Sequence, residues 1–498
     1  MAEDHAVRQL LESAAQRGID YRETSPRRGV APSAHAVKAV DRFIEPMPEH
    51  PTADLTVLEQ LDEVGTPATV TMTGPRYFGF VIGGSLPVTV ASNWLATAWD
   101  QNVGMHEVTP ATATLERVAM SWMIDLFGLP EESSAAFVTG ATIANFASLA
   151  AARNRVYRDA GWNVEADGLY GAPPISILVG EEVHPTVIKG LGLLGFGRER
   201  VIRLEVDGQG RIDPTRLPKV EGPTIVCTQA GNVNTGAFDP VADICDAVKP
   251  AGAWVHVDGA FGLWAAASPD RKHLCNGFQA ADSWATDAHK WLNVPYDSGI
   301  AFVRDGVALK AAMSISAEYL LTESEFRNPS DYTPELSRRA RGVDVWAALK
   351  SLGKAGVARL IDRCCSNARR FAAGLEAAGF HVLNDVVLNQ VLVSFGADAQ
   401  TRRIIDAIQE EGTCWCGVTV WQGQTAMRIS VVGGGQMMGQ AGRSDVGGRN
   451  SSMARQLLKQ MGILPAMVDV GGRRNRTLTL RIADGEVEVN VAGQSLES

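Results

Sequence analysis

The sequence predicts an α/β fold whose large domain is built on a mostly parallel sheet. Short apolar runs alternate with helical patterns between residues 135 and 303, and crossover helices of this kind join parallel strands. After Asp305 the alternation loosens into helices followed by short strand-like runs, which is typical of a smaller α+β domain. With 50 glycines and 23 prolines in 498 residues, the composition is that of an ordinary globular protein with a large core.

The N-terminal segment is predicted to be helical. Amphipathic patterns cover residues 36–43 and 55–64, and a segment of this kind often packs on a partner subunit. A longer helix is predicted from Ala113, because apolar residues recur there at spacings of three and four. Gly128 ends this pattern and Pro130 follows it, which is a typical signal for a helix C-terminus.

Alternating runs define the large domain. Strands are predicted at 135–138, 175–179, 201–204, 224–228, 254–257 and 300–303. Helices are predicted at 142–157, after Pro185 and at 241–248. In sheets of this class ligands bind beyond the carboxyl ends of the strands. The polar residues that follow these runs are therefore the candidates for a functional site.

The last third of the chain is predicted to be separate from the large sheet. Helices are predicted at 341–352 and 357–378, and strands at 380–383, 390–394 and 427–431. A glycine-rich stretch after residue 432 is typical of a flexible linker. We therefore divide the chain into an N-terminal helical segment (1–74), a large α/β domain (75–320), a small α+β domain (321–431) and a C-terminal extension (432–498).

Composition and charge argue against several classes of protein. The formal net charge is −10 and the basic residues are scattered, so nucleic acid is not an expected partner. Residues 1–21 do not resemble a signal peptide, and no apolar run reaches about eighteen residues, so we expect a soluble, cytoplasmic protein without a membrane partner. The seven cysteines show no Cys-x-x-Cys spacing, which argues against a disulfide framework and against a bound metal such as zinc.

The first candidate for chemistry is the lysine in Ala-Thr-Asp-Ala-His-Lys-Trp. Lys290 follows a short apolar run and stands in a polar turn beside His289. A lysine amine can hold an aldehyde cofactor covalently. For a lysine taken alone, a surface position after a strand is the alternative.

The second candidate is the carboxylate that ends the run Ala-Trp-Val-His-Val-Asp. Asp258 closes a predicted buried strand, where a carboxylate is costly unless it is paired. The protonated ring nitrogen of a pyridoxal cofactor would be such a partner, and the pairing would keep the ring electron-withdrawing. An aspartate that caps a turn is the alternative if Asp258 is taken alone.

Three further polar segments follow predicted strands. Gly140, Ala141 and Thr142 lead directly into a helix, whose free amides and dipole suit a phosphate; a simple N-cap by Thr142 is the alternative. His184 stands before a proline and could stack on an aromatic cofactor, although a lone histidine in a turn is more often structural. The loop 231–236 indicates only a turn by itself. In chain order, these groups supply anion donors, a ring platform, a carboxylate and a lysine at successive strand ends.

These motifs, in this order, resemble the group II pyridoxal-phosphate decarboxylases of the aspartate aminotransferase fold type I superfamily. The family includes aromatic amino acid and glutamate decarboxylases. The matching motifs are Thr-Gly-Ala-Thr-x-Ala-Asn, the histidine at 184, His-Val-Asp-x-Ala and His-Lys-Trp, and the resemblance runs from about residue 76 to 304 and less clearly to about 431. It implies a seven-stranded, mostly parallel sheet, pyridoxal 5'-phosphate as the cofactor and a homodimer.

The resemblance implies a role for each residue around the cofactor ring. Lys290 would hold the cofactor as a Schiff base, and Asp258 would bind the pyridine nitrogen. His184 would stack on the ring, and Ala260 would pack against it.

The resemblance also implies how the phosphate and the substrate are held. Residues 140–142 would bind the phosphate with help from His289. Tyr77 and Phe78 would bind the substrate, across a dimer interface if the site is shared.

The sequence departs from the family in three places. Asp287 and Ala288 stand where the family has Asn-Pro before His-Lys, which changes the charge near the phosphate. In the aromatic amino acid decarboxylases a tyrosine on a mobile loop protonates the substrate, and Tyr332 stands in a similar but shorter segment. A tyrosine that packs at the domain junction is the alternative for Tyr332. The segment after residue 430 does not resemble the closing helix of the family.

The sequence therefore predicts an enzyme that decarboxylates a small L-amino acid, aromatic or acidic, with Tyr332 as its general acid. Other reactions on the same cofactor stay open, namely those of an aminotransferase, an aldolase or another lyase. A non-catalytic scaffold is the remaining alternative, and the retention of both Lys290 and Asp258 argues against it.

Overall fold

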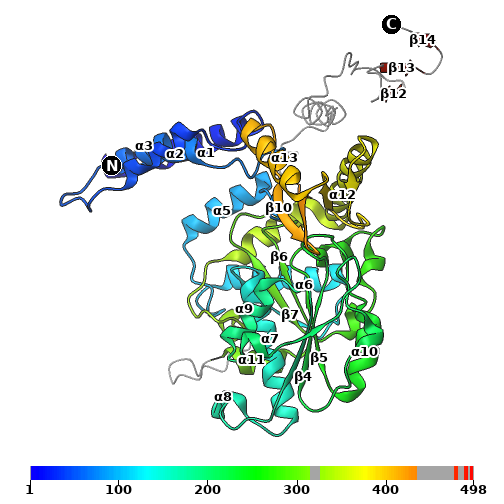
Figure 1. Ribbon diagram of the computed structural model, residues 1–498. Coiled ribbons are helices and arrows are strands. Elements are labelled where there is room, and N and C mark those ends of the chain that lie inside the picture. Colours follow the sequence, from blue (N-terminus) through cyan, green and yellow to red (C-terminus); the bar gives the residue numbers. More distant parts are fainter. Residues whose placement is uncertain (1, 315–325, 434–475, 481–486, 492–493, 497–498) are drawn as a thin grey trace.

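The computed structural model describes residues 2–314, 326–433, 476–480, 487–491 and 494–496. The chain begins with an arm of helices that projects from the body of the molecule (Figure 1). The arm contains α1 (Ala2–Thr24), α2 (Ala34–Ala39), η1 (Val40–Phe43), α3 (Asp54–Gln60), η2 (Leu61–Gly65) and α4 (Thr66–Ala68). Two helices of the body follow, α5 (Pro87–Trp99) and α6 (Pro110–Phe127). Gly128 ends α6 in the left-handed conformation, as the sequence predicts.

The large domain is built on a seven-stranded sheet, which confirms the predicted fold class. Its strands are β1 (Ser134–Val138), β2 (Ser176–Gly180), β3 (Ile202–Leu204), β4 (Thr224–Gln229), β5 (Trp254–Asp258), β6 (Ser283–Asp287) and β7 (Gly299–Val303). Their order is β1-β7-β6-β5-β4-β2-β3, and β7 runs antiparallel to both of its neighbours while the other pairs are parallel. The carboxyl ends of β2, β4, β5 and β6 therefore lie along one edge.

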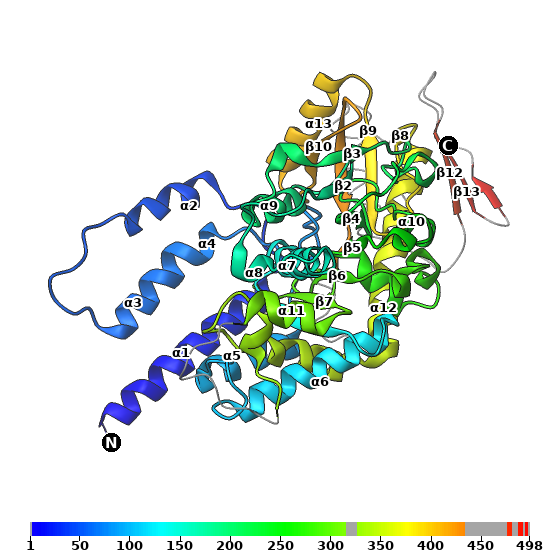
Figure 2. The same ribbon diagram turned by 90° about the horizontal axis from the view of Figure 1, so that it is seen from below.

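Helices cover both faces of the large sheet. The crossover helices are α7 (Ala141–Asp159), α8 (Val164–Asp167), α9 (Pro185–Leu193), α10 (Val241–Val248) and α11 (Gly306–Met313). Short 3-10 turns join them: η3 (Arg198–Arg200), η4 (Pro214–Arg216), η5 (Lys249–Ala251), η6 (Gly262–Ala267), η7 (Lys272–Cys275) and η8 (Phe278–Ala280). One core cluster includes residues of α7, α9 and α11, and the other includes residues of α6, α10 and a later helix, α12 (Arg341–Ala377) (Figure 2).

Side chains alternate along β5, so its residues divide between the two faces of the sheet. Val255 and Val257 belong to the cluster packed with α6 and α10, whereas Trp254 belongs to the cluster packed with α7. Because side chains alternate along a strand, His256 and Asp258 point to the same face as Trp254. This is the face covered by α7, a helix rich in small alanines that allow close packing.

The small domain has a four-stranded antiparallel sheet of order β10-β11-β9-β8. Its elements are α12 (Arg341–Ala377), β8 (His381–Val382), β9 (Gln390–Ser394), α13 (Asp398–Glu411), β10 (Gly417–Trp421) and β11 (Gln424–Ser430). Gly353 adopts φ 60° and ψ 173° inside α12, and this break agrees with the prediction of two helices. The sequence reading missed α13 and β10.

The segment between the two sheets lies against the large domain. It contains η10 (Pro329–Tyr332), and the Ser330 hydroxyl donates to the Gly104 carbonyl at 2.9 Å. Arg338 forms a buried ion pair with Glu116 at 3.0 Å and donates to the Phe137 carbonyl at 2.8 Å. The division of the chain at residues 74, 320 and 431 stays a prediction.

The described part of the C-terminal extension forms a three-stranded antiparallel sheet. Its strands are β12 (Arg476–Leu480), β13 (Val487–Val491) and β14 (Gln494–Leu496). The predicted glycine-rich linker falls almost entirely on residues outside the described ranges. In the parts of the chain that are described, no helix is long and apolar enough to cross a membrane.

Candidate active site

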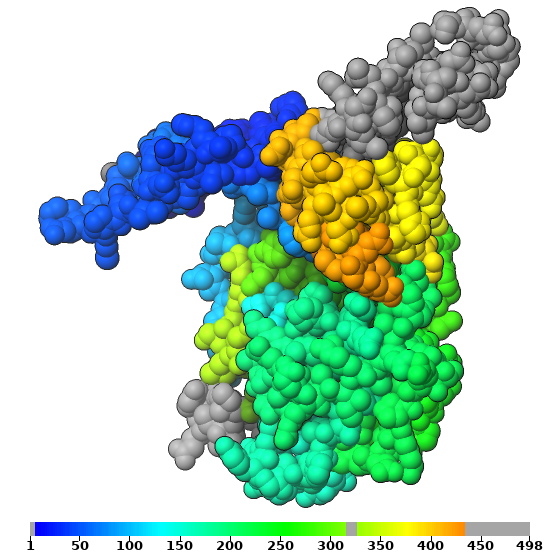
Figure 3. Space-filling model, in the orientation of Figure 1, coloured from blue at the N-terminus to red at the C-terminus, as the bar shows by residue number. Residues whose placement is uncertain are grey.

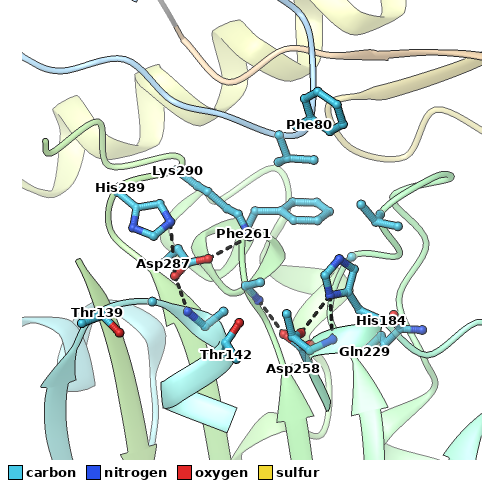
Figure 4. A pocket seen from close by; sticks show the side chains of 17 residues that line it. Phe80, Thr139, Thr142, His184, Gln229, Asp258, Phe261, Asp287, His289 and Lys290 are labelled. Carbon is cyan, nitrogen blue, oxygen red and sulfur yellow. Dashed lines mark hydrogen bonds and ion pairs between the residues drawn. The ribbon is translucent and has the colours of Figure 1, made fainter. Parts of the chain in front are cut away.

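A pocket of about 320 Å³ lies beyond the carboxyl ends of the large-sheet strands, at the N-terminus of α7 (Figure 4). All eight residues predicted to bind the cofactor line it: Gly140, Ala141, Thr142, His184, Asp258, Ala260, His289 and Lys290. They come from four separate segments of the chain, so the fold brings together groups that lie up to 150 residues apart in sequence (290 − 140). The predicted cofactor-binding set therefore lines one cavity.

Asp258 ends β5 at the floor of the pocket and is 4% exposed. Its Oδ2 accepts from Asn145 Nδ2 at 3.1 Å, and its Oδ1 accepts from the Ala260 amide at 3.2 Å. Burial raises the pKa of the carboxyl, while the charges of His184 and Lys290 and the hydrogen bonds lower it. The described residues give Asp258 no ion-pair partner in hydrogen-bonding contact.

Lys290 enters the pocket from the turn after β6. Its Nζ lies 2.8 Å from Asp287 Oδ2, and its side chain is 19% exposed. The segment before α5 packs against this turn, because a Cβ at Gly83 would overlap the Lys290 carbonyl oxygen. Phe80 and Val81, on the same segment, thereby line the pocket, and Phe80 lies across it from Asp258 (Figure 4).

The N-terminus of α7 forms an anion cradle. Gly140 precedes the helix, and a Cβ at Gly299 on β7 would overlap the Gly140 backbone, so β7 and the start of α7 can approach this closely only because Gly299 has no side chain. The Ala141 amide donates to Asp287 Oδ1 at 2.6 Å, so a carboxylate already occupies one of the anion donors. The hydroxyl-bearing Thr142 also lines the pocket.

The two pocket histidines have defined hydrogen-bonding partners. His289 Nδ1 accepts from the Ser298 amide at 3.1 Å, so its proton lies on Nε2, which is 3.5 Å from Asp287 Oδ1. His184 caps α9, and its Nδ1 lies 2.8 Å from the Thr186 hydroxyl. Burial lowers the pKa of both imidazoles. Both rings are therefore expected to be neutral near pH 7.

Two predicted substrate contacts lie elsewhere in the chain. Tyr77 stacks on Trp415 with ring centroids 5.2 Å apart, and Phe78 meets Phe371 edge-on at 5.1 Å. Neither residue lines the pocket of its own chain, whose wall is formed by Phe80 instead. The expectation that Tyr77 and Phe78 bind the substrate across a dimer interface stays a prediction.

Tyr332 also lies outside the pocket of its own chain. The Arg327 guanidinium stacks on its ring at 3.7 Å, and the ring packs at the edge of the core cluster that contains α7 and α11. This arrangement corresponds to the packing alternative within one chain, and the role of Tyr332 as general acid stays a prediction.

Several pocket residues were not found from the sequence. Gln229, Phe261 and Thr186 line the cavity, and Asn145 contacts Asp258 from behind it. Asn145 belongs to the motif already recognised in the sequence, so its position one turn into α7 could have indicated it. The others follow strands but carry no chemical signal of their own.

These residues fit pyridoxal 5'-phosphate. The buried Asp258 carboxylate needs a cation, which a protonated pyridine nitrogen supplies. The amides at the start of α7 suit a phosphate, and Lys290 offers an amine for a covalent bond to the aldehyde. The one feature that opposes the fit is the Asp287 carboxylate in the anion cradle.

The fold and this site define a fold type I pyridoxal-phosphate enzyme. The sequence profile described as "Pyridoxal-dependent decarboxylase conserved domain" matches residues 39–397, and the chain belongs to this family. A second profile, "CheD chemotactic sensory transduction", matches residues 422–491, much of which lies outside the described ranges.

Curated relatives are amino acid decarboxylases. The chain is 29% identical to the acidic amino acid decarboxylase of Bos taurus over 62% of this chain and 61% of that one. It is 26% identical to the aromatic-L-amino-acid decarboxylase of Bacillus atrophaeus over 75% of this chain and 78% of that one. The chain thus spans less than two thirds of the length of the cattle relative.

Solved structures share the fold. A crystal structure of Oryza sativa TDC with PLP and tryptamine superposes with a TM-score of 0.83 at 22% identity, covering 93% of this chain and 99% of that one. Mouse CSAD superposes with a TM-score of 0.80 at 22% identity, covering 91% and 99%. These likenesses confirm the predicted fold type I architecture.

Proposed function

We propose that this chain catalyses the pyridoxal 5'-phosphate-dependent decarboxylation of a small L-amino acid, with Lys290 as the covalent attachment point. The observation that carries the proposal is that Lys290 and Asp258 line one pocket in a chain of the decarboxylase family. Asp258 is buried and would be stabilised there by a cation. When bound, the cofactor supplies an electron-withdrawing ring that stabilises negative charge on the α-carbon of the substrate.

Each pocket residue has one task in this proposal. Asp258 holds a positive charge at the ring nitrogen, and His184 presents a neutral imidazole against the ring. Residues 140–142 and His289 bind the phosphate. Phe80 and Phe261 form apolar walls that exclude water, which strengthens these electrostatic contacts.

Lys290 is the group best placed to return a proton to the α-carbon after carbon dioxide leaves. It lines the pocket, and its Nζ lies 2.8 Å from Asp287 Oδ2. Tyr332 does not line this pocket in its own chain, so its role as general acid would require a second subunit. General-acid catalysis of this kind contributes about a hundred- to ten-thousand-fold.

The substrate side chain is proposed to be aromatic or otherwise apolar. Phe80, Val81 and Phe261 line the pocket, and no arginine does so among the described residues. A second carboxylate on an acidic substrate would therefore lack a cationic partner within one chain. The aromatic-L-amino-acid decarboxylase of Bacillus atrophaeus also aligns over more of this chain than the cattle acidic amino acid decarboxylase does.

A panel of L-amino acids tests this proposal. The holoenzyme is incubated with tryptophan, phenylalanine, tyrosine, leucine, aspartate, glutamate and cysteine sulfinate, and carbon dioxide, amine, keto acid and aldehyde are measured. Equal amounts of carbon dioxide and amine from an aromatic substrate are expected. Keto acid without carbon dioxide would indicate an aminotransferase, and a preference for glutamate or aspartate would contradict the substrate class.

The chain is further proposed to act as a homodimer. The helical arm stands clear of the body along most of its length (Figure 3), and its exposed apolar side chains include Leu11, Ile44, Met47 and Leu61. Monomers rarely leave such surface uncovered, and a second copy is the commonest way to bury it. Light scattering should give twice the mass of 53.2 kDa. A monomer that keeps full activity would contradict this.

A cytoplasmic location is proposed on the state of the cysteines. All seven are free and buried, as expected for a protein kept in a reducing compartment. Fractionation of the source cells would test it, and recovery outside the cytoplasm would contradict it.

A further inference from the structure

Four buried polar side chains form a line behind Asp258, on the side away from the pocket. They are Asn145 on α7, His256 and Trp254 on β5, and Ser283 on β6. Asn145, His256 and Ser283 are 0% exposed and Trp254 is 4% exposed. Most polar groups that are buried this deeply in proteins are hydrogen-bonded.

Each member of the line contacts the next. Trp254 Nε1 lies 2.8 Å from Ser283 Oγ, and Ser283 Oγ lies 2.9 Å from His256 Nδ1. His256 Nε2 lies 2.9 Å from Asn145 Oδ1, and Asn145 Nδ2 lies 3.1 Å from Asp258 Oδ2. The chain therefore connects an indole to the carboxylate through four hydrogen bonds.

The two ends dictate the direction of every bond. The indole N–H can only donate, so Ser283 accepts from Trp254 and has its own hydrogen free for His256 Nδ1. An ionised carboxylate can only accept, so the Asn145 amide nitrogen faces Asp258 and its oxygen faces His256.

His256 must then be the neutral tautomer with its proton on Nε2. This agrees with its environment, because burial lowers the pKa of the imidazole to about 3. Every hydrogen in the chain points toward Asp258. Aligned hydrogen bonds polarise one another and strengthen the last one, which opposes the cost of burying the charge.

We propose that Asn145, His256, Ser283 and Trp254 are positioning residues that keep Asp258 ionised and hold its Oδ2 in place through a one-directional hydrogen-bond chain. The Ala260 amide holds the other oxygen. The hydrogen-bond chain forms entirely within the protein. Its role rests on the proposed function, in which Asp258 faces a ring nitrogen.

If this hydrogen-bond chain is correct, two substitutions of His256 should have different effects. His256→Gln keeps it, because a glutamine amide can donate to Asn145 Oδ1 while its carbonyl accepts from Ser283. His256→Leu breaks it and leaves Asn145 free to turn. Thr228→Val is the matched control, since the Thr228 hydroxyl donates to the His256 carbonyl at 3.1 Å and lies outside the chain.

The first experiment uses the cofactor-free protein. Nitrogen-15 NMR of histidine-labelled protein, with His256→Gln used to assign the signal, should show a neutral imidazole protonated on Nε2 near pH 7. A proton on Nδ1, or a charged imidazole, would overturn the proposal whatever the enzyme catalyses.

The second experiment follows binding of cofactor labelled with nitrogen-15 in its ring. His256→Leu should weaken binding by about ten- to a hundredfold, the range for losing a hydrogen bond to a charged group, and the ring nitrogen should lose its proton. His256→Gln and Thr228→Val should both behave like the unaltered chain.

The outcomes separate this inference from the proposed function. A protonated ring nitrogen and unchanged affinity in His256→Leu, or an equal loss in Thr228→Val, would overturn the hydrogen-bond chain. If the unaltered protein shows the expected His256 tautomer and a protonated cofactor ring but releases no carbon dioxide, only the proposed reaction is contradicted. If His256→Leu does not fold, the tautomer and the Gln variant still decide the question.

Discussion

Lys290 and Asp287 form an ion pair inside the pocket, with Nζ 2.8 Å from Oδ2. The other carboxylate oxygen of Asp287 accepts a hydrogen bond from the amide of Ala141, the first residue of α7. One side chain thus contacts both the attachment lysine and the anion cradle. A phosphate that binds there must share the cradle with a negative charge. The family motif has a neutral asparagine at this place, so the effect of the charge can be tested by one substitution.

Asp287→Asn is expected to tighten the binding of pyridoxal 5'-phosphate by at least about tenfold, equivalent to about 1.4 kcal/mol. The amide still accepts from Ala141, but the repulsion of the phosphate is removed. Pyridoxal, which lacks the phosphate, should not gain in affinity. Titration of the cofactor-free protein by tryptophan fluorescence measures both constants.

A matched control removes a charge from the same turn without touching the cradle. Asp297 pairs with Arg341 at 2.9 Å and does not line the pocket. Asp297→Asn should leave both affinities unchanged. An equal gain for pyridoxal and its phosphate in Asp287→Asn would show that the carboxylate acts through Lys290 rather than through the cradle.

Lys290→Ala is expected to abolish the covalent retention of cofactor after borohydride reduction. The reason is that no other amine among the described residues lines the pocket. Mass spectrometry of the reduced, denatured chain gives the result. Lys310→Ala is the control, because Lys310 pairs with Asp331 outside the pocket, and a phosphopyridoxyl adduct found on any lysine other than 290 would contradict the assignment.

The sequence was sufficient for most of the large domain because strand runs such as 300–303 are fully apolar and end at polar residues. It was also sufficient to select Lys290, Asp258 and His184 as residues that line one pocket, since their polar side chains stand out against apolar neighbours. By contrast, α13 was missed although Ile404, Ile405 and Ile408 share one face, because charged residues dominate its sequence.

Other parts of the site could not be read from the chain alone. Phe80 reaches the pocket only because Gly83 lets its segment pack against the Lys290 turn, which is a tertiary contact between distant residues. Tyr332 was assigned by resemblance of a loop, yet its ring is held by Arg327. Positions that depend on packing between segments carry no local signal.

Tyr332→Phe is expected to leave the ratio of amine to carbon dioxide unchanged. The phenyl ring keeps the contact with Arg327, and the lost hydroxyl does not line the pocket. Chromatography of products from the best substrate measures amine and aldehyde. Appearance of aldehyde in the variant would show that Tyr332 supplies the proton after all, from a neighbouring subunit.

Arg338→Met is expected to lower the free energy of unfolding by about 3–5 kcal/mol, the cost of leaving a buried charge unpaired. The Arg338 side chain is fully buried, and its partner Glu116 would lose its cation. Urea unfolding followed by fluorescence measures the change. Arg339→Met is the matched control, because Arg339 donates to Asn93 and Thr97 at an exposed position; a similar loss there would contradict the role of the buried pair.

The neutral state of His256 also predicts how stability depends on pH. Its pKa is about 3 in the folded chain, lowered by burial from the ordinary value of 6.5. Between these two values the unfolded chain binds one more proton than the folded chain, so acid favours unfolding. The stabilisation is complete above pH 6.5 and is lost as the pH falls toward 3.

His256→Gln should therefore flatten the pH dependence of the free energy of unfolding below pH 6.5. One proton contributes a slope of up to about 1.4 kcal/mol per pH unit, and the variant should lose that contribution because glutamine does not titrate. Urea unfolding at pH 7, 6 and 5 measures the slopes. His273 is exposed on η7, so His273→Gln should change the slope little. Parallel curves for the unaltered chain and His256→Gln would mean that the imidazole is already charged in the folded protein, and a charged imidazole could not accept from Ser283 as the hydrogen-bond chain requires.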